Sequence, residues 1–149
     1  MSNSLNSKEK DILKTLRNKQ KMSRKDKVQY LSIFIHPESS VGLEIGPNLT
    51  PLFSKKSGFQ VNYLETVSTN ELKRRVQDSG KDSDLVEEID FVFQRGKNLV
   101  ENIEKYNYYD YVVSSHVVEH IPDFVSHLQE VSIVLKDSGI LGLIIPDKR

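Results

Sequence analysis

Five short apolar runs, separated by longer polar stretches, organise the chain from residue 41 onward. The runs lie at 41–45, 61–65, 90–94, 109–115 and 140–145. Their length suits β-strands, and their nearly continuous apolar character is typical of strands that are buried on both faces. The pattern therefore predicts a parallel sheet of about five strands.

The polar stretches between these runs carry helix signals. Thr50 and Pro51 suit the start of a short helix, and Gly58 suits its left-handed end. Further helices are expected over 70–77, 99–106 and 122–136. The last is the clearest, because one stripe collects Phe124, Leu128, Val131 and Leu135. Strands that alternate with helices predict an α/β fold with helices on both faces of the sheet.

The first part of the chain is interpreted as a basic helical arm. Helices are expected over 11–19 and 24–35, the second capped by Ser23 and stopped by His36-Pro37. The first 30 residues hold nine Lys or Arg against three acids, so this part carries +6 although the whole chain is neutral. A solvated helix pair with buried apolar faces explains this charge, and an acidic partner is the alternative. The domain division is 1–38 for the arm and 39–149 for the sheet domain.

The composition of the chain argues against several classes of function. The chain has 149 residues, of which 37% are hydrophobic and 28% charged, as in ordinary one-domain globular proteins. No apolar run approaches the ~20 residues of a membrane span, and the polar start lacks a secretory segment, so a cytoplasmic location without a membrane partner is expected. The absence of cysteine excludes disulfides and thiolate zinc sites. No nucleic-acid partner is expected, because the basic residues are not interleaved with aromatic ones.

The first two apolar runs end in residues that suit a nucleoside-bearing cofactor. Gly46 follows the first run, and Glu65 ends the second about twenty residues later. A glycine at a strand end lets the backbone approach a ligand, while a carboxylate at the next strand end can accept both ribose hydroxyls. The spacing predicts a cofactor pocket at this edge of the sheet.

Four motifs in order resemble the class I S-adenosylmethionine-dependent methyltransferases. They are Leu43-Glu44-Ile45-Gly46-Pro47, the acidic strand end Glu65, the segment Ser115-His116-Val117-Val118-Glu119-His120-Ile121-Pro122-Asp123, and Pro146-Asp147-Lys148-Arg149. The resemblance runs from about Val41 to Arg149. It implies a Rossmann-like open parallel sheet with strand order 3-2-1-4-5, and S-adenosylmethionine as the cofactor.

The resemblance also assigns roles to the first two strand ends. The loop of Gly46, Pro47 and Asn48 is expected near the methionine moiety, although Asn48 stands where a further glycine often occurs. Glu44 is expected to orient this loop or to accept from the cofactor ammonium, directly or through water. Glu65 is expected to bind the ribose diol.

Three further positions follow from the same resemblance. Thr66 is expected to border the adenine, and Gln94 to contact its edge. Ser114, Ser115 and His116 end the fourth strand, where the family presents the methionine end and the transferable methyl group. His116 is the candidate catalytic base for an acceptor that must lose a proton, because alignment does most of the remaining work in methyl transfer. The acceptor is expected to be a small molecule or a saccharide-related compound.

Several alternatives stay open at this point. His116-x-x-Glu119-His120 matches the zinc-binding pattern of inverted metallopeptidases, but Pro122 leaves only a short ligand helix and no third ligand is evident. A divalent metal bound by Glu119 and His120 is another alternative, whereas the preferred interpretation has no metal. A nicotinamide-binding protein would use Glu65 equally well, but the loop is poor in glycine. A non-catalytic cofactor-binding or interaction module is the remaining one.

The last apolar run raises a question about the sheet edge. Class I methyltransferases usually add two strands after the fifth, and the sequence ends before them. A largely apolar strand at a sheet edge is a liability unless something covers it. We expect either a fragment of a longer enzyme or a homodimer that pairs through this strand.

Overall fold

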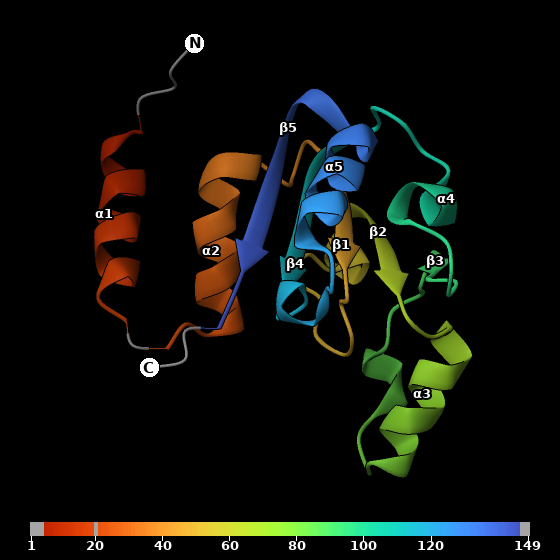
Figure 1. Ribbon diagram of the computed structural model, residues 1–149. Helices are drawn as coiled ribbons and strands as arrows, with labels where there is room; N and C mark the ends of the chain where they lie inside the picture. The colour runs from red at the N-terminus through yellow and green to blue at the C-terminus, as the bar shows by residue number, and fades with distance from the viewer. Residues whose placement is uncertain (1–4, 20, 147–149) are drawn as a thin grey trace.

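The computed structural model describes residues 5–19 and 21–146, so Asp147, Lys148 and Arg149 of the last motif lie outside the described residues. Its centre is a five-stranded sheet of order β3-β2-β1-β4-β5 in which every neighbouring pair is parallel (Figure 1). The strands are β1 (Val41–Ile45), β2 (Gln60–Glu65), β3 (Phe91–Val92), β4 (Tyr109–Ser115) and β5 (Leu135–Ile144). The predicted Rossmann-like α/β fold and its strand order are confirmed.

The described residues form five α-helices: α1 (Ser7–Arg17), α2 (Arg24–Ile35), α3 (Thr69–Asp78), α4 (Leu99–Ile103) and α5 (Phe124–Val134). Side-chain oxygens cap their first turns, as expected for Ser, Asn and Asp at this position. Ser23 caps α2 and Asn98 caps α4, each in a reciprocal pairing with the acid three residues later. α2 begins and ends as the sequence predicts, and His36 ends it in a left-handed conformation.

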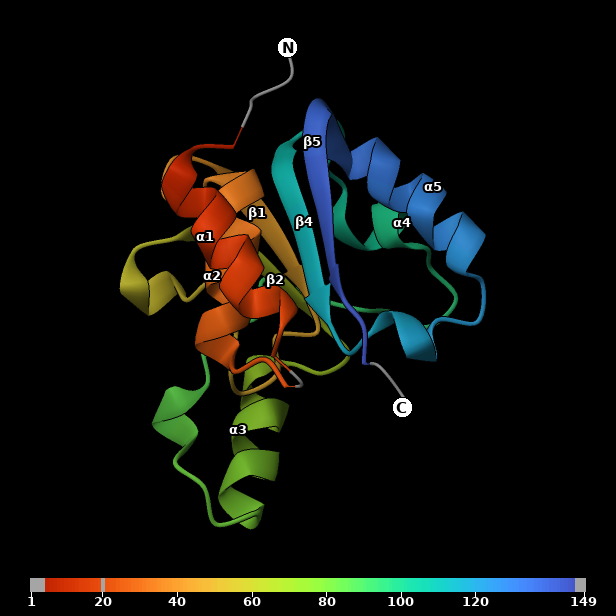
Figure 2. The same ribbon diagram turned by 90° about the vertical axis from the view of Figure 1, so that its left-hand side faces the viewer.

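The helices cover the two faces of the sheet (Figure 2). On one face, Leu31 and Ile35 of α2 pack against Tyr63, Tyr111 and Val113 of the strands. The other face packs against α4 and α5 in a second cluster that contains Leu43, Leu64, Leu99, Val112 and Val131. α1 lies outside α2, and α3 extends beyond the end of β2. Alternate residues of the strands therefore feed two separate cores, as expected for a sheet covered on both sides.

The helix expected after Thr50 does not form, apart from the single 3-10 turn η1 (Lys55–Ser57) that ends at left-handed Gly58. Side chains from other elements bind the backbone groups of this segment. The N–H groups of Leu52 and Phe53 donate to Glu44 Oε1 and Oε2 at 2.7 and 3.2 Å. The Arg24 guanidinium donates to the carbonyl oxygens of Pro51 and Leu52. Arg24 thus occupies carbonyl groups that a helix would use, and Glu44 satisfies N–H groups that the start of a helix leaves without an intrahelical partner.

Other boundaries differ from the sequence expectation by a few residues. β3 spans only two residues at the sheet edge, where the Gln94 N–H donates to Asn102 Oδ1 instead of continuing the strand. α4 ends at Ile103 because Glu104 adopts φ 53°. α5 ends at Val134, and β5 begins at the next residue rather than at Ile140.

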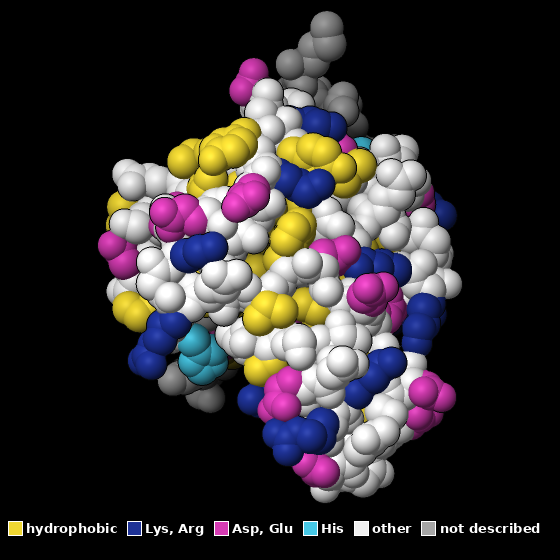
Figure 3. Space-filling model, turned by 90° about the vertical axis from the view of Figure 1, so that its right-hand side faces the viewer, with side chains coloured by type: hydrophobic (Ala, Val, Ile, Leu, Met, Phe, Trp, Pro, Cys, Tyr) yellow, Lys and Arg dark blue, Asp and Glu magenta, His cyan; other side chains and the backbone are white. Residues whose placement is uncertain are grey.

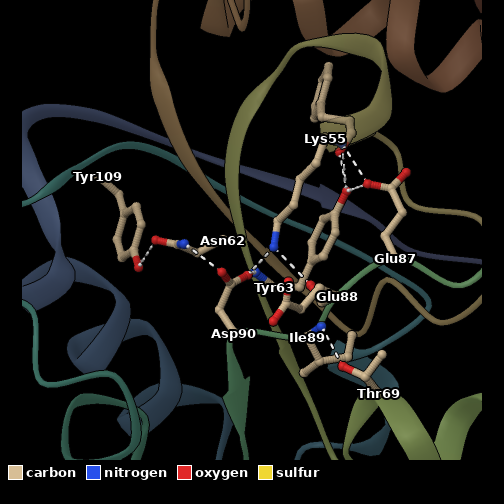
Figure 4. A network of polar contacts seen from close by, with 10 residues as sticks. Lys55, Asn62, Tyr63, Thr69, Glu87, Glu88, Ile89, Asp90 and Tyr109 are labelled. Carbon is tan, nitrogen blue, oxygen red and sulfur yellow. Dashed lines mark hydrogen bonds and ion pairs between the residues drawn. The ribbon is translucent and has the colours of Figure 1, made fainter.

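A polar network fixes residues 87–90 against β2 (Figure 4). Glu87, although buried, accepts from the Lys55 N–H at 2.7 Å, from the Tyr63 hydroxyl at 3.0 Å and from the Ser54 hydroxyl. Asp90 accepts from the Tyr63 N–H at 2.6 Å and from Lys55 Nζ at 2.5 Å. These bonds hold β3 at the edge of the sheet despite its short length.

Apolar and charged side chains are unevenly distributed over the surface. Figure 3 shows that apolar side chains gather on the upper part of the face near α4, whereas charged side chains of both signs surround α3. Phe93, Tyr106 and Tyr108 are among the exposed large apolar residues. Within residues 5–19 and 21–146, no helix combines the length and apolar character that a membrane crossing requires.

Candidate functional site

A cleft of about 760 Å³ opens where the parallel strands end. Its floor is formed by Ile45 at the end of β1, by Gly46 directly after it, and by Leu64 and Glu65 of β2, and His116 after β4 lies at its margin. The loop before α4 and the turn and first residues of α5 form its walls. Open α/β sheets bind their ligands at this edge, next to the strand where the order reverses, which here is β1.

Gly46 adopts φ +69°, and its N–H donates to the Leu64 carbonyl at 2.9 Å. A Cβ at this position would come within 2.7 Å of Val117 Cγ2. Both the left-handed backbone and the close approach require glycine. The chain therefore turns sharply at the mouth of the cleft, as the sequence predicts.

Glu65 also lines the cleft and is tied to its neighbours. Its Oε2 accepts from the Asn48 N–H at 3.2 Å, and its Oε1 accepts from the N–H and hydroxyl of Thr66 at 2.7 and 3.0 Å. A carboxylate has about four acceptor positions, so one remains, and rotation of the Thr66 hydroxyl would free a second. Two free positions on one carboxylate suit a ribose diol, and Asn48 and Thr66 both line the same cleft.

Glu44 is buried beneath the loop rather than in the cleft. Only 2% of its surface is exposed, and both carboxylate oxygens accept from the loop N–H groups of Leu52 and Phe53. Burial raises the pKa of Glu44 to about 7, against the effect of these two hydrogen bonds. Of the two roles expected for Glu44, this geometry suits the orientation of the loop.

His116 stands at the margin of the cleft in a left-handed conformation, φ +59°. Its Nε2 lies 3.2 Å from Lys27 Nζ, and its Nδ1 lies 3.7 Å from Glu119 Oε1. Lys27 Nζ also donates to the Ser115 hydroxyl at 3.1 Å. Sequence reasoning missed Lys27, because a contact across almost ninety residues leaves no local pattern.

Other expected site residues lie away from the cleft lining. Ser114 is buried within β4, Pro47 is buried within the loop after β1, and Gln94 is exposed beside α4. Ser115 faces Lys27 of α2. Phe93, the residue before Gln94, lines the cleft in its place.

The wall formed by α5 was also missed. His127 and Glu130 line the cleft, and burial lowers the pKa of His127 below its usual value. Glu130 Oε2 accepts from the Leu99 N–H at 2.8 Å and so joins α5 to the start of α4. Of the apolar stripe predicted for this helix, Val131 is buried and Leu128 is half-buried, whereas Phe124 is exposed and Leu135 belongs to β5. The stripe did not include His127 and Glu130, which line a ligand-sized space.

The described part of the chain contains no group of three His, Asp or Glu side chains close enough together to hold a metal ion. His120 lies in the short turn η3 (Val118–His120) rather than on a full helix. The described geometry therefore gives the zinc pattern His116-x-x-Glu119-His120 no support from a third ligand.

Comparison with known proteins agrees with this geometry. The family model described as a methyltransferase domain matches residues 43–143. No curated protein matches the sequence. Similar solved structures include the DszA carbon methyltransferase, with a TM-score of 0.54 at 17% identity over 80% of this chain and 34% of that one. A putative sarcosine dimethylglycine methyltransferase from Galdieria sulphuraria has a TM-score of 0.54 at 19% identity, over 80% of this chain and 45% of that one.

A third similar structure is the glycopeptide N-methyltransferase MtfA complexed with sinefungin. Its TM-score is 0.50 at 16% identity, over 78% of this chain and 51% of that one. The chain thus spans between a third and about half the length of these structures, and at such low identity the likeness shows the fold. The family match covers most of the chain, and this chain belongs to the methyltransferase domain family, among the class I S-adenosylmethionine-dependent methyltransferases.

Proposed function

We propose that the chain binds S-adenosylmethionine in the cleft and forms the cofactor-binding part of an enzyme that methylates a small-molecule acceptor. The main support is the position of Glu65 at the end of β2, facing the cleft beside the turn at Gly46. Saccharide-related compounds are among the acceptors to be assayed. The proposed function needs no metal.

The lining of the cleft fits the parts of this cofactor. Glu65 has acceptor positions for the ribose diol. Apolar side chains of Leu64, Leu99 and Ile121 offer a surface for the adenine, and such a mixture of apolar wall and few polar groups is usual for cofactor sites. Glu44 acts from below by fixing the loop through Leu52 and Phe53.

When bound, S-adenosylmethionine supplies a methyl group on a positively charged sulfur. The chain itself needs to hold that group in line with the acceptor, and a base is needed only where the acceptor must lose a proton. His116 at the margin of the cleft is the candidate for this role. Its Nε2 is bonded to Lys27 in the described structure, so proton transfer requires that contact to open.

Calorimetric titration of the chain with S-adenosylhomocysteine tests the proposed binding. We expect saturable binding that NAD does not displace. Absence of binding at millimolar ligand would overturn the proposal. Displacement of bound S-adenosylhomocysteine by an equal concentration of NAD would favour a dinucleotide site.

A non-catalytic cofactor-binding module is the second candidate, and the bond between Lys27 and His116 favours it. A radiolabelled methyl-transfer assay with a panel of small acceptors separates the two candidates. Transfer that is lost in His116→Asn would support an enzyme that uses this base. Normal binding of S-adenosylhomocysteine without transfer to any acceptor would favour the module.

A further inference from the structure

Lys27 of α2 reaches the end of β4 and makes two contacts there. Its Nζ lies 3.1 Å from Ser115 Oγ and 3.2 Å from His116 Nε2. The ion pairs found among the described residues do not include Lys27. The ammonium therefore rests on a hydroxyl and an imidazole, and no described carboxylate lies within ion-pair distance.

These contacts define the state of His116. An ammonium group can only donate, so Nε2 must accept, and the ring proton then belongs on Nδ1, which faces Glu119. The lone pair that a base would use is thus occupied by Lys27. His116 is held in this place by its left-handed backbone and by the bond from its N–H to the Ile144 carbonyl at 2.9 Å.

The position of Lys27 is equally well supported. Leu31 and Ile35 of the same helix are buried against the sheet. The helix start is fixed by the reciprocal cap between Ser23 and Asp26. The ammonium is therefore carried by a packed helix, one side chain away from the cleft.

The charges along the cleft favour an anion at this end. Glu65, Asp123 and Glu130 line its other parts, and Lys97 is the cation near α4. An anionic group entering the cleft would be repelled by the three carboxylates and attracted toward Lys97 and Lys27, and of these two cations Lys27 lies at the β4 end. The ammonium already makes a charge-assisted hydrogen bond to the imidazole, and an anion adds the attraction of a full opposite charge, so an anion would compete with His116.

Building on the proposed function, we propose that Lys27 binds a carboxylate of the bound ligand at the β4 end of the cleft. When the ammonium turns to this carboxylate, it releases His116 Nε2. The carboxylate belongs either to the amino-acid end of the cofactor or to the acceptor. Lys27 is thus an anion-binding residue, and it also positions the candidate base by masking it until the ligand arrives.

The test uses the full chain, Lys27→Met, Lys27→Arg and the control Lys25→Met. Lys25 is an exposed residue of the same helix. Each protein is titrated with S-adenosylhomocysteine and with methylthioadenosine, which keeps the adenosine but lacks the carboxylate. If the cofactor supplies the carboxylate, Lys27→Met weakens S-adenosylhomocysteine binding about tenfold or more and leaves methylthioadenosine binding unchanged. Lys27→Arg and Lys25→Met keep the affinity.

The second arm detects a carboxylate from the acceptor. The nitrogen NMR signal of His116 Nε2 is followed while acetate is added to the chain saturated with S-adenosylhomocysteine. If the acceptor supplies the carboxylate, acetate shifts this signal in the wild type and in Lys25→Met but not in Lys27→Met. Thermal unfolding of each variant verifies that it is folded.

The outcomes separate the two proposals. Suppose that both adenosine ligands bind, that Lys27→Met leaves both affinities unchanged, and that acetate does not shift the His116 Nε2 signal. The inference about Lys27 is then overturned and the proposed function stands. If neither adenosine ligand binds the wild type, the proposed function falls, and the inference falls with it.

Discussion

The Asn48 N–H donates to Oε2 of Glu65, and this 3.2 Å bond joins the loop after β1 to the end of β2. Asn48 holds a left-handed conformation at φ 50°, which asparagine tolerates better than most residues. The two strand ends that we propose to bind the cofactor are thus connected within the protein itself. A change at either residue is expected to act on the other.

Glu65→Ala tests this arrangement. The variant loses the acceptor for the ribose diol and the tie to Asn48, and we expect S-adenosylhomocysteine to bind more weakly by about 2 to 3 kcal/mol, roughly 30- to 150-fold. Calorimetry measures the affinity, and Glu38→Ala, at an exposed glutamate before β1, is the matched control. Equal affinities of the two variants would show that Glu65 does not bind the ligand.

Arg24→Met tests the support of the loop by α2. The guanidinium donates to the carbonyl oxygens of Pro51 and Leu52, and hydrogen bonds from charged groups typically stabilise by about 1.5 to 3 kcal/mol. We expect the free energy of unfolding in urea to fall by about 2 kcal/mol and ligand affinity to fall with it. Lys25→Met, one residue along the helix, is expected to change neither quantity. A fully stable Arg24→Met would mean that the loop holds its conformation without α2.

The buried carboxyl group of Glu44 is expected to give the free energy of unfolding an unusual dependence on pH. Burial raises its pKa in the folded chain from 4.5 to about 7, so the folded state takes up a proton between these values. The free energy of unfolding contributed by Glu44 therefore decreases as pH rises from about 4.5 to 7, by roughly 3 kcal/mol in all. Burial lowers the pKa of His127, which acts in the opposite direction and raises stability as pH increases.

Comparison with Glu44→Gln isolates the contribution of Glu44, since His127 is common to both proteins. Urea unfolding is measured for both proteins at about pH 5 and about pH 8, on either side of the shifted pKa. We expect the free energy of unfolding to fall less between these two values in Glu44→Gln than in the wild type. Identical pH profiles for the two proteins would mean that Glu44 titrates normally in the folded chain.

Two buried tyrosines offer a paired test of hydrogen bonding in the core. The Tyr111 hydroxyl has no hydrogen-bond partner among the described residues, whereas the Tyr63 hydroxyl donates to the Phe53 carbonyl at 2.7 Å. We expect Tyr111→Phe to keep or increase the free energy of unfolding, by up to about 1 kcal/mol, and Tyr63→Phe to lose about 1 to 2 kcal/mol. Thermal and urea unfolding measure both. A loss in Tyr111→Phe as large as that in Tyr63→Phe would contradict the assignment.

The pairing of two chains through β5 stays a prediction. β5 pairs with β4 on one side, and no strand of residues 5–19 and 21–146 pairs with its other edge. Ile140, in this strand, is exposed. We expect sedimentation to show a dimer that Ile140→Lys dissociates, because a charged side chain on an edge strand opposes pairing. A wild-type monomer at high concentration would count against it.

Local patterns were sufficient for the elements that carry their own signals. The apolar runs located the strands, and Ser23 and His36-Pro37 set both ends of α2. The turn at Gly46 was equally predictable, because a left-handed residue at a strand end calls for glycine. These signals lie within a few residues of the structure that they specify.

Other features depend on contacts between residues far apart in the sequence, and local patterns could not predict them. The segment after Thr50 has good helix-start residues, yet Arg24 binds the Pro51 and Leu52 carbonyl groups that a helix would use. β3 ends early where the Gln94 N–H donates to Asn102 of α4, a contact that nothing in the sequence of the strand itself indicates. Lys27 reaches His116 only after the whole sheet has formed.

The packing of α2 on the sheet has a practical consequence for anyone who shortens this chain. A version that starts at residue 39 would discard Leu31 and Ile35 from one core, and with them the guanidinium of Arg24 and the ammonium of Lys27. Purification tags and fusion partners are therefore best joined ahead of Ser23. If such a shorter version failed to bind the ligand, the missing helix would explain the failure, and the result would not test the binding residues of the cleft.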